Sequence, residues 1–179
     1  NWCLVAYAGE AWARKIFPKL EPEKAQAKLW KAIFETARID QPNPIKTWEK
    51  HIVALRDLCK RARESTDRAI FFSEGALSPD MSIHAHGGMA VFPILCLTEP
   101  DYVTELHEIT TEHTLRNMRM LLPEVAPYVD VIMAAADDWG TQKSTIASPA
   151  TYRHLFLPYR RRINDEFHRI APQVKIFLH

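Results

Sequence analysis

The sequence contains little glycine and little cysteine, and the cysteines form no pattern. Only 5 of its 179 residues are glycine, against 12 prolines, which predicts a helix-rich fold whose element boundaries are marked by proline. The three cysteines, Cys3, Cys59 and Cys96, are widely spaced and form no C-x-x-C pair. We therefore expect reduced thiols in a cytoplasmic protein rather than a disulfide framework.

An excess of charge of one sign is missing, and so are long apolar runs. Lys and Arg total 23 and Asp and Glu total 22, so the formal net charge of +1 argues against a dedicated nucleic-acid-binding protein. No apolar run approaches the ~20 residues of a membrane span, and the start carries no apolar core of a secretory signal. We expect neither a nucleic-acid partner nor a membrane. The composition, 47% hydrophobic and 25% charged, is typical of one globular domain or two small ones.

Several catalytic signatures are absent as well. The sequence has no glycine-rich phosphate loop, no G-x-S-x-G and no H-E-x-x-H. His84 and His86 have the spacing of a metal pair on a strand, but a solvated linker is the favoured interpretation because no further ligand is near in sequence. His107 and His113 lie about two turns apart on a predicted helix, which favours positions on its surface or at the edge of a core.

The clearest structural pattern lies between residue 130 and the end. Residues 130–135 and 174–178 are short apolar runs, typical of strands buried on both faces of a parallel sheet. A helix is predicted over 148–171, where Ser148 can act as the N-cap and apolar residues recur at helical spacing. Pro158 should bend this helix or leave one carbonyl unpaired. Two adjacent parallel strands joined by a right-handed crossover are therefore expected.

Polar residues follow both predicted strands, at the edge where α/β proteins place their functional groups. Asp137 and Asp138 follow the first strand and His179 ends the second. We expect an Asp of the pair and His179 at one sheet edge, within about 10 Å of each other. The two carboxylates could orient a substrate, take a proton or help hold a metal, and a plain turn is an alternative of equal weight. The following loop adds candidate substrate-binding residues: Gly140, Thr141 and Gln142.

The rest of the chain predicts alternating short elements. Proline breaks and apolar periodicity place helices over 11–17, from Pro22, after the break at 42–44, and from Pro100, with short strands at 3–7 and 69–72.

The residues from about 88 to 179 carry a set of motifs: EPDYVTELHEITTEHTLRNM, YVDVIMAAADDWGTQ, IASPATYRHLFLPYRRRIND and VKIFLH. This set resembles the uroporphyrinogen decarboxylase superfamily, and is closer to its methyltransferase-like branch. The resemblance implies part of a (β/α)8 barrel, a lyase or methyltransferase activity, and a small-molecule substrate that is a tetrapyrrole or is linked to a corrinoid. It would make Asp137 and Asp138 catalytic residues of the cleft. His179 would match the histidine of a zinc-binding H-x-C-G motif, so zinc is the implied cofactor.

The first half carries different motifs: WCLVAYAGEAWARKIFP, KLWKAIFETARID and PIKTWEKHIVALRDLC. Over roughly residues 1–75 they resemble the thermophilic metallo-aminopeptidase family, whose members are two-domain exopeptidases with cocatalytic metals. The metal ligands of that family lie downstream of this region, so the resemblance assigns no catalytic residue here. We therefore expect an aminopeptidase-like α/β fragment over 1–75, a join over 76–90 and a decarboxylase-like partial barrel over 91–179, with few contacts crossing from 1–72 to 91–179.

Three functions follow from these resemblances. The main hypothesis is a fragment of a uroporphyrinogen decarboxylase-like enzyme, inactive as it stands, from a family that decarboxylates tetrapyrroles or transfers corrinoid-linked methyl groups. The first alternative is a fragment of a metal-dependent aminopeptidase, which would remove N-terminal residues from peptides. The second is a catalytically silent α/β domain. The sequence leaves open whether the two halves are a native fusion, and it does not predict an oligomeric state.

Overall fold

The computed structural model describes residues 7–77, 81–83, 88–135 and 137–178. The chain divides into two compact units, Asn1–Val53 and Ala54–His179. Nearly all of the strand predicted at 3–7, together with His84, His86 and His179, lies outside the described residues. Among the described helices, none combines the length and the apolar character that crossing a membrane requires.

The first unit is built from helices. Helix α1 (Glu10–Ile16) packs against α2 (Pro22–Ala37), and α3 (Pro44–Ser65) begins after them. The predicted helices at 11–17 and from Pro22 are thereby confirmed. The core between α1 and α2 is small, with partly buried Phe17, Trp30 and Ile33 packed around four buried residues: Ala8, Ala13, Ala25 and Leu29.

Contacts of Arg38 and Trp48 stabilise the turn between α2 and α3. Arg38 ends α2 with a φ of 57°, a left-handed conformation that is uncommon outside glycine. Its guanidinium lies 4.3 Å from the ring centre of Trp48, and the Trp48 indole donates a hydrogen bond of 3.1 Å to the Ala37 carbonyl. Helix α3 buries little of its surface, since Cys59 is its one buried residue.

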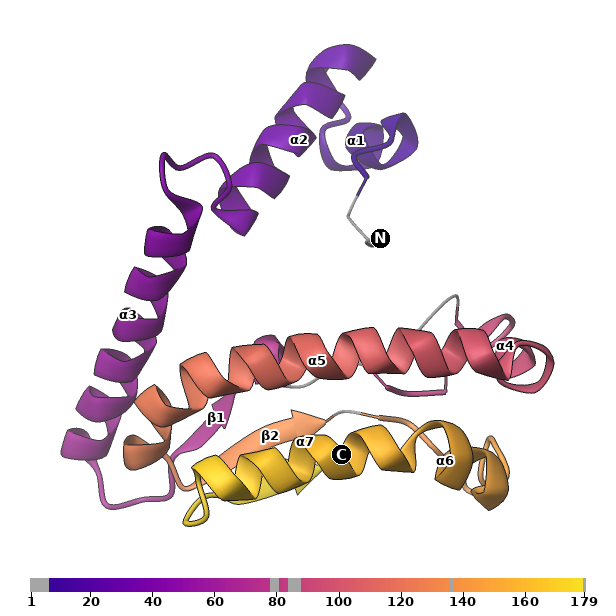
Figure 1. Cartoon of the computed structure of the whole chain (residues 1–179). Coiled ribbons are helices and arrows are strands. Elements are labelled where there is room, and N and C mark those ends of the chain that lie inside the picture. The colour runs from indigo at the N-terminus through magenta and orange to yellow at the C-terminus, as the bar shows by residue number, and fades with distance from the viewer. Residues whose placement is uncertain (1–6, 78–80, 84–87, 136, 179) are drawn as a thin grey trace. The chain divides into compact units, whose positions relative to one another are not determined.

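The second unit contains a three-stranded parallel sheet in the order β1-β2-β3 (Figure 1). The strands are β1 (Phe71–Ser73), β2 (Val131–Ala135) and β3 (Lys175–Leu178), and Ile132 of β2 lies opposite Ile176 of β3. The predicted parallel pairing of strands near 130–135 and 174–178 is confirmed. The helix-rich α/β class is therefore as predicted. The sheet is open, and the described residues do not form the expected partial barrel.

Helices fill both crossovers of this sheet. The long helix α5 (Pro100–Val125) leads into β2 through a 3₁₀ turn, η2 (Ala126–Tyr128), and packs against α7 (Leu157–Ile170) alongside the strands (Figure 1). The shorter elements are η1 (Gly75–Leu77), α4 (Phe92–Thr98) and α6 (Pro149–Leu155). The largest fully buried apolar side chains of this unit form its core: Leu77, Met81, Ile83, Phe92, Met118, Leu122, Ile132, Leu155, Phe156, Ile163 and Phe167.

The helix predicted over 148–171 is two helices. Helix α6 ends at Leu155, and α7 begins at Leu157 with Pro158 in its first turn, where its missing N–H is tolerated. The break at Phe156 is the bend that Pro158 is expected to cause. The predicted N-cap is confirmed, because the Ser148 hydroxyl accepts a hydrogen bond of 3.0 Å from the Thr151 amide.

The expectation that few contacts cross the join is wrong. Strand β1 pairs with β2 in register, with Phe71 opposite Val131. The Asp130 carboxylate accepts a hydrogen bond of 2.7 Å from the Ile70 amide and also pairs with Arg63 of α3. Residues before and after the predicted join therefore belong to one sheet. A short strand such as β1 is stable only when it is paired, so its formation depends on β2.

Candidate functional site

The carboxyl end of β2 carries a buried ion pair. The Asp137 carboxylate pairs with the Arg160 guanidinium of α7, and both side chains are only 8% exposed. The other Asp137 oxygen accepts a hydrogen bond of 3.4 Å from the Met81 amide, and Arg160 also donates one of 3.2 Å to the Ala134 carbonyl. Asp137 thus holds together the end of β2, helix α7 and the segment 81–83, and its charge is neutralised by Arg160.

Asp138 has a different environment from its neighbour. It is exposed, as are Gly140, Thr141 and Gln142 in the loop that follows. That loop folds back on itself, since the Thr141 amide donates a hydrogen bond of 2.8 Å to the Ser144 carbonyl and the Thr141 hydroxyl accepts from the Ser144 amide at 3.2 Å. The two predicted catalytic carboxylates therefore separate into one buried group and one solvent-facing group.

Aromatic rings fix the base of this loop. The Trp139 ring meets the rings of Tyr152 and Phe156 edge-on, with centroid distances of 4.8 and 4.5 Å. Edge-to-face packing of this kind stabilises beyond the area it buries, by about 0.5–1.5 kcal/mol a pair. Asp138 and the exposed loop are thus anchored on α6 and the break before α7.

Arg160 is a site residue that the sequence pattern alone did not single out. It belongs to the triplet 160–162, which interrupts the apolar stripe of the predicted helix. Its spacing from Phe156 and Ile163 places it on that buried stripe, and a buried arginine implies an acidic partner. This signal is present in the sequence, but the partner cannot be read from it.

Two histidines also differ from each other. His107 of α5 is fully buried and its Nδ1 lies 2.7 Å from the Leu155 carbonyl, so it belongs to the core rather than to the surface or the edge. His113 is exposed on the same helix, as expected. The predicted proximity of His179 to the Asp pair falls outside the described residues.

The side chains that could bind a metal are dispersed. Within the described ranges, no group of three or more His, Cys, Asp or Glu residues is arranged so that it could hold a metal ion. Metal sites in proteins need at least three such ligands for zinc and more oxygen ligands for calcium. The part of the chain that the structure describes therefore does not fit a catalytic metal centre.

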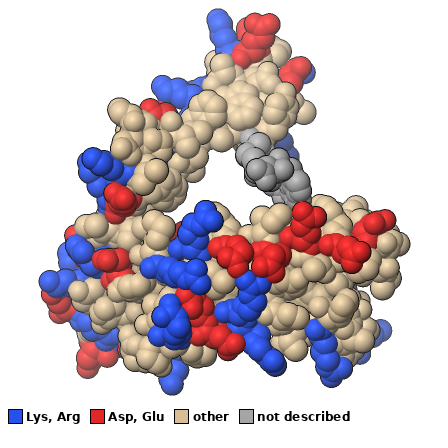
Figure 2. Space-filling view, in the orientation of Figure 1, with Lys and Arg blue, Asp and Glu red and all other residues tan. Residues whose placement is uncertain are grey.

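Charges on the second unit form networks of mixed sign. Arg162 of α7 pairs with Glu108 and Glu112 of α5, and Glu166 pairs with Arg119 and Arg169. The two arginines, Arg169 first and then Arg119, lower the pKa of Glu166 from its ordinary 4.5 to about 2. Lys, Arg, Asp and Glu side chains are interspersed on the face drawn in Figure 2. This face does not resemble the basic surface of a nucleic-acid-binding protein.

Comparison with known proteins finds relatives of the first half. The pattern of the thermophilic metalloprotease (M29) family matches residues 1–86. The resemblance to the aminopeptidases is confirmed. Aminopeptidase T of Thermus aquaticus is 45% identical over 72 residues, which cover 40% of this chain and 18% of the relative. Aminopeptidase 2 of Geobacillus stearothermophilus is 48% identical over 50 residues, covering 28% of this chain and 12% of the relative.

One match reaches further along the chain. Aminopeptidase T of Thermus thermophilus is 34% identical over 132 residues, covering 68% of this chain and 32% of the relative. It is longer than the segment 1–86, so it extends into the second half. The chain spans about a third or less of the length of these curated relatives. No solved structure matches the chain.

These findings correct the main functional hypothesis. The matches are to aminopeptidases, and none of the three comparisons supports the uroporphyrinogen decarboxylase resemblance or the lyase, methyltransferase and barrel assignments that depend on it. The expectation of a tetrapyrrole or corrinoid-linked substrate depended on the same resemblance and is wrong for the same reason. The motifs of the second half misled because a strand, an Asp-containing loop and a helix recur at the carboxyl edge of many unrelated α/β sheets.

Proposed function

We propose that the chain is part of a metal-dependent aminopeptidase, which hydrolyses the N-terminal residue from peptides. The observation that supports this proposal is the similarity of the chain to Aminopeptidase T, found for the proteins of both Thermus thermophilus and Thermus aquaticus. The metalloprotease family that matches residues 1–86 implies a metal cofactor, and we propose zinc as that metal and a peptide as the substrate. Two buried free thiols, Cys59 and Cys96, support a reducing, cytoplasmic location.

The described residues are proposed to contribute structure and substrate contacts rather than the metal centre. They hold no cluster of three metal ligands, so no hydrolytic step is assigned to them. Asp138 and the exposed loop of Gly140, Thr141 and Gln142 are proposed to contact a polar substrate. Asp137 is proposed to fix that loop through its pairing with Arg160. His179 follows β3 in the sequence and carries an imidazole, which is a common zinc ligand, so it is proposed as one metal ligand.

A segment exchange tests the proposal. The 72-residue stretch of Thermus aquaticus Aminopeptidase T that matches this chain is replaced by the corresponding residues of the chain, and hydrolysis of an aminoacyl chromogenic substrate is measured. The chimera is expected to retain metal-dependent turnover that EDTA abolishes and zinc restores. A chimera that folds, as judged by circular dichroism, but has no turnover would contradict the proposal.

The 179-residue chain itself provides the second arm of this experiment. With added zinc we expect no detectable turnover, because two-metal hydrolysis needs a set of ligands that the described residues do not supply. Turnover that disappears in Asp138→Ala would instead place an active site in this chain. The exposed Asp165→Ala serves as the matched control, because it removes a carboxylate of α7 away from the loop.

A further inference from the structure

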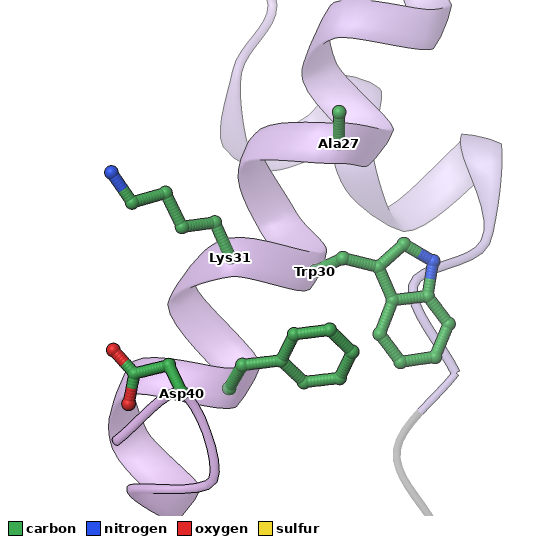
Figure 3. A pocket seen from close by; sticks show the side chains of 5 residues that line it. Ala27, Trp30, Lys31 and Asp40 are labelled. Atoms are coloured by element: carbon green, nitrogen blue, oxygen red, sulfur yellow. The ribbon is translucent and has the colours of Figure 1, made fainter. Parts of the chain in front are cut away.

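Helix α2 carries a hollow of about 560 Å³, lined by Ala27, Trp30, Lys31, Phe34 and Asp40 (Figure 3). We call it the α2 hollow. A neighbouring groove of about 710 Å³ shares Trp30 and Phe34, and both spaces are lined by residues of the first unit alone. Pockets that bind small molecules have volumes of about 300–1,000 Å³ and combine an apolar lining with a few polar groups. The α2 hollow has this size and this kind of lining.

Two aromatic side chains form the apolar part of the α2 hollow. The rings of Trp30 and Phe34 lie one helical turn apart, with their centroids 5.5 Å from each other. Phe34 is 41% exposed and Trp30 is half-buried, so a ligand can contact both rings. Packing of an apolar side chain against them is favourable because it removes apolar surface from water. Aromatic rings also attract an ammonium group through their negative faces. The hollow therefore suits a ligand that carries an apolar side chain close to a positive charge.

The charged part of the α2 hollow is one anion and one cation. Figure 3 shows Lys31 and Asp40 on the same flank of α2, with Lys31 nearer the beginning of the helix and Asp40 just past its end. The rise of α2 from Lys31 to its last residue is about 9 Å, so the two charges lie on the order of 10 Å apart. An extended tripeptide spans about 10 Å and has an ammonium at one end and a carboxylate at the other. The hollow thus matches a short peptide in length and in the signs of its end charges.

We propose that the α2 hollow binds short peptides whose first residue is apolar. The choice of a peptide as the ligand rests on the proposed function, because an aminopeptidase binds peptides that have a free N-terminal ammonium. In this site the ammonium pairs with Asp40, and the side chain of the first residue packs on Phe34 and Trp30. The C-terminal carboxylate of a tripeptide reaches Lys31. The first unit thereby recognises a free N-terminus together with a leucine-like side chain.

Glu35 competes with the peptide carboxylate for Lys31. Its own carboxylate lies 3.7 Å from the Lys31 ammonium, with both groups exposed. We therefore expect the peptide to gain less from Lys31 than from Asp40. Exposed ion pairs stabilise weakly in any case, so the packing of the apolar side chain supplies most of the affinity. A peptide such as Leu-Gly-Gly should bind with a Kd on the order of 1 mM.

Titration of the whole 179-residue chain with Leu-Gly-Gly tests this site. Binding is followed by NMR, in which the shifts of the Trp30 indole and the Asp40 amide give the Kd and the location together. Three altered peptides each remove one of the proposed contacts. N-acetyl-Leu-Gly-Gly lacks the ammonium and should bind about threefold more weakly, and the C-terminal amide of Leu-Gly-Gly about twofold. Gly-Gly-Gly lacks the apolar side chain and should bind about tenfold more weakly.

Variants of the chain show whether these groups meet at the α2 hollow. Asp40→Asn should weaken Leu-Gly-Gly about threefold and remove most of the effect of acetylation, because the ammonium has then lost its partner. Lys31→Gln should likewise remove the difference between the free carboxylate and the amide. Phe34→Ser should weaken binding about tenfold while the helical circular dichroism remains that of the unaltered chain. Glu23→Gln and Lys24→Gln change exposed charges at the beginning of the same helix and should leave the Kd unchanged.

The outcomes separate this site from the proposed function. Unchanged shifts of Trp30 and Asp40 at about 10 mM Leu-Gly-Gly overturn the peptide site. So does binding that Gly-Gly-Gly reproduces, or binding that Asp40→Asn and acetylation weaken independently. None of these measurements depends on turnover. The proposed function is contradicted instead by a folded but inactive chimera of Aminopeptidase T, so the failure of one proposal is distinguishable from the failure of the other.

Discussion

Removal of Arg160 should destabilise the second unit strongly, because it leaves a buried carboxylate without its cation. Asp137 and Arg160 are each 8% exposed, so neither charge can be fully hydrated when its partner is lost. Breaking a buried ion pair from one side costs about 3–5 kcal/mol. Arg160→Met, which keeps most of the aliphatic volume, is expected to lower the free energy of unfolding by about 3 kcal/mol, near the lower end of that range because slight exposure lets some water in.

Replacing both partners checks that the lost pairing is the cause. Asp137→Leu alone should cost about as much as Arg160→Met, because a buried guanidinium is then unpaired. The double variant should cost only about 1–2 kcal/mol, the loss of the hydrogen bonds to the Ala134 carbonyl and from the Met81 amide. Independent effects would instead add to about 6 kcal/mol.

The assay must report on the second unit alone. Hydrogen exchange of the β2 amides, Val131–Ala135, followed in increasing urea at pH 7, gives the free energy of opening of the sheet. Arg161→Met is the matched control, because Arg161 is the exposed neighbour of Arg160, and it should change that free energy by less than about 0.5 kcal/mol. A cost below about 1 kcal/mol for Arg160→Met, or a double variant as unstable as the sum of the single ones, would refute a stabilising role of the pair.

Two further predictions concern stability. Arg169 and Arg119 lower the pKa of Glu166 to about 2, so the carboxylate stabilises the fold above its ordinary pKa of 4.5 and loses this effect as the pH falls from there toward 2. Glu166→Gln should therefore lower the Tm at pH 6, and the difference from the unaltered chain should shrink at pH 3 and in high salt; a difference independent of pH would contradict the linkage. Ser148→Ala removes the N-cap of α6 and should cost about 1 kcal/mol in urea unfolding, whereas Ser148→Gly should cost only a few tenths; equal losses would mean that the hydroxyl is not acting as a cap.

Local pattern was sufficient for most elements of this chain, although it missed α4 and joined α6 and α7 into one helix. Pro22 begins α2 and Ser148 caps α6, as the sequence predicted, because proline and a capping hydroxyl act within one helical turn. The parallel pairing of β2 and β3 also followed from the sequence, since two buried strands joined by a helix have few other arrangements. The motifs of residues 1–75 were enough to identify the aminopeptidase resemblance.

Contacts between distant residues were decided only by the tertiary structure. Asp137 and Asp138 are adjacent and chemically identical, so their sequence predicts the same role for both, yet the fold buries one against Arg160 and exposes the other. The pairing of β1 with β2 joins segments about 60 residues apart, and neither strand specifies its partner by pattern. The sequence therefore determined where most helices and strands form. It also determined which family the first half resembles. Only the tertiary structure decided which charged side chains are buried and paired. Burial depends on which distant residues pack against a side chain, and sequence neighbours do not determine this.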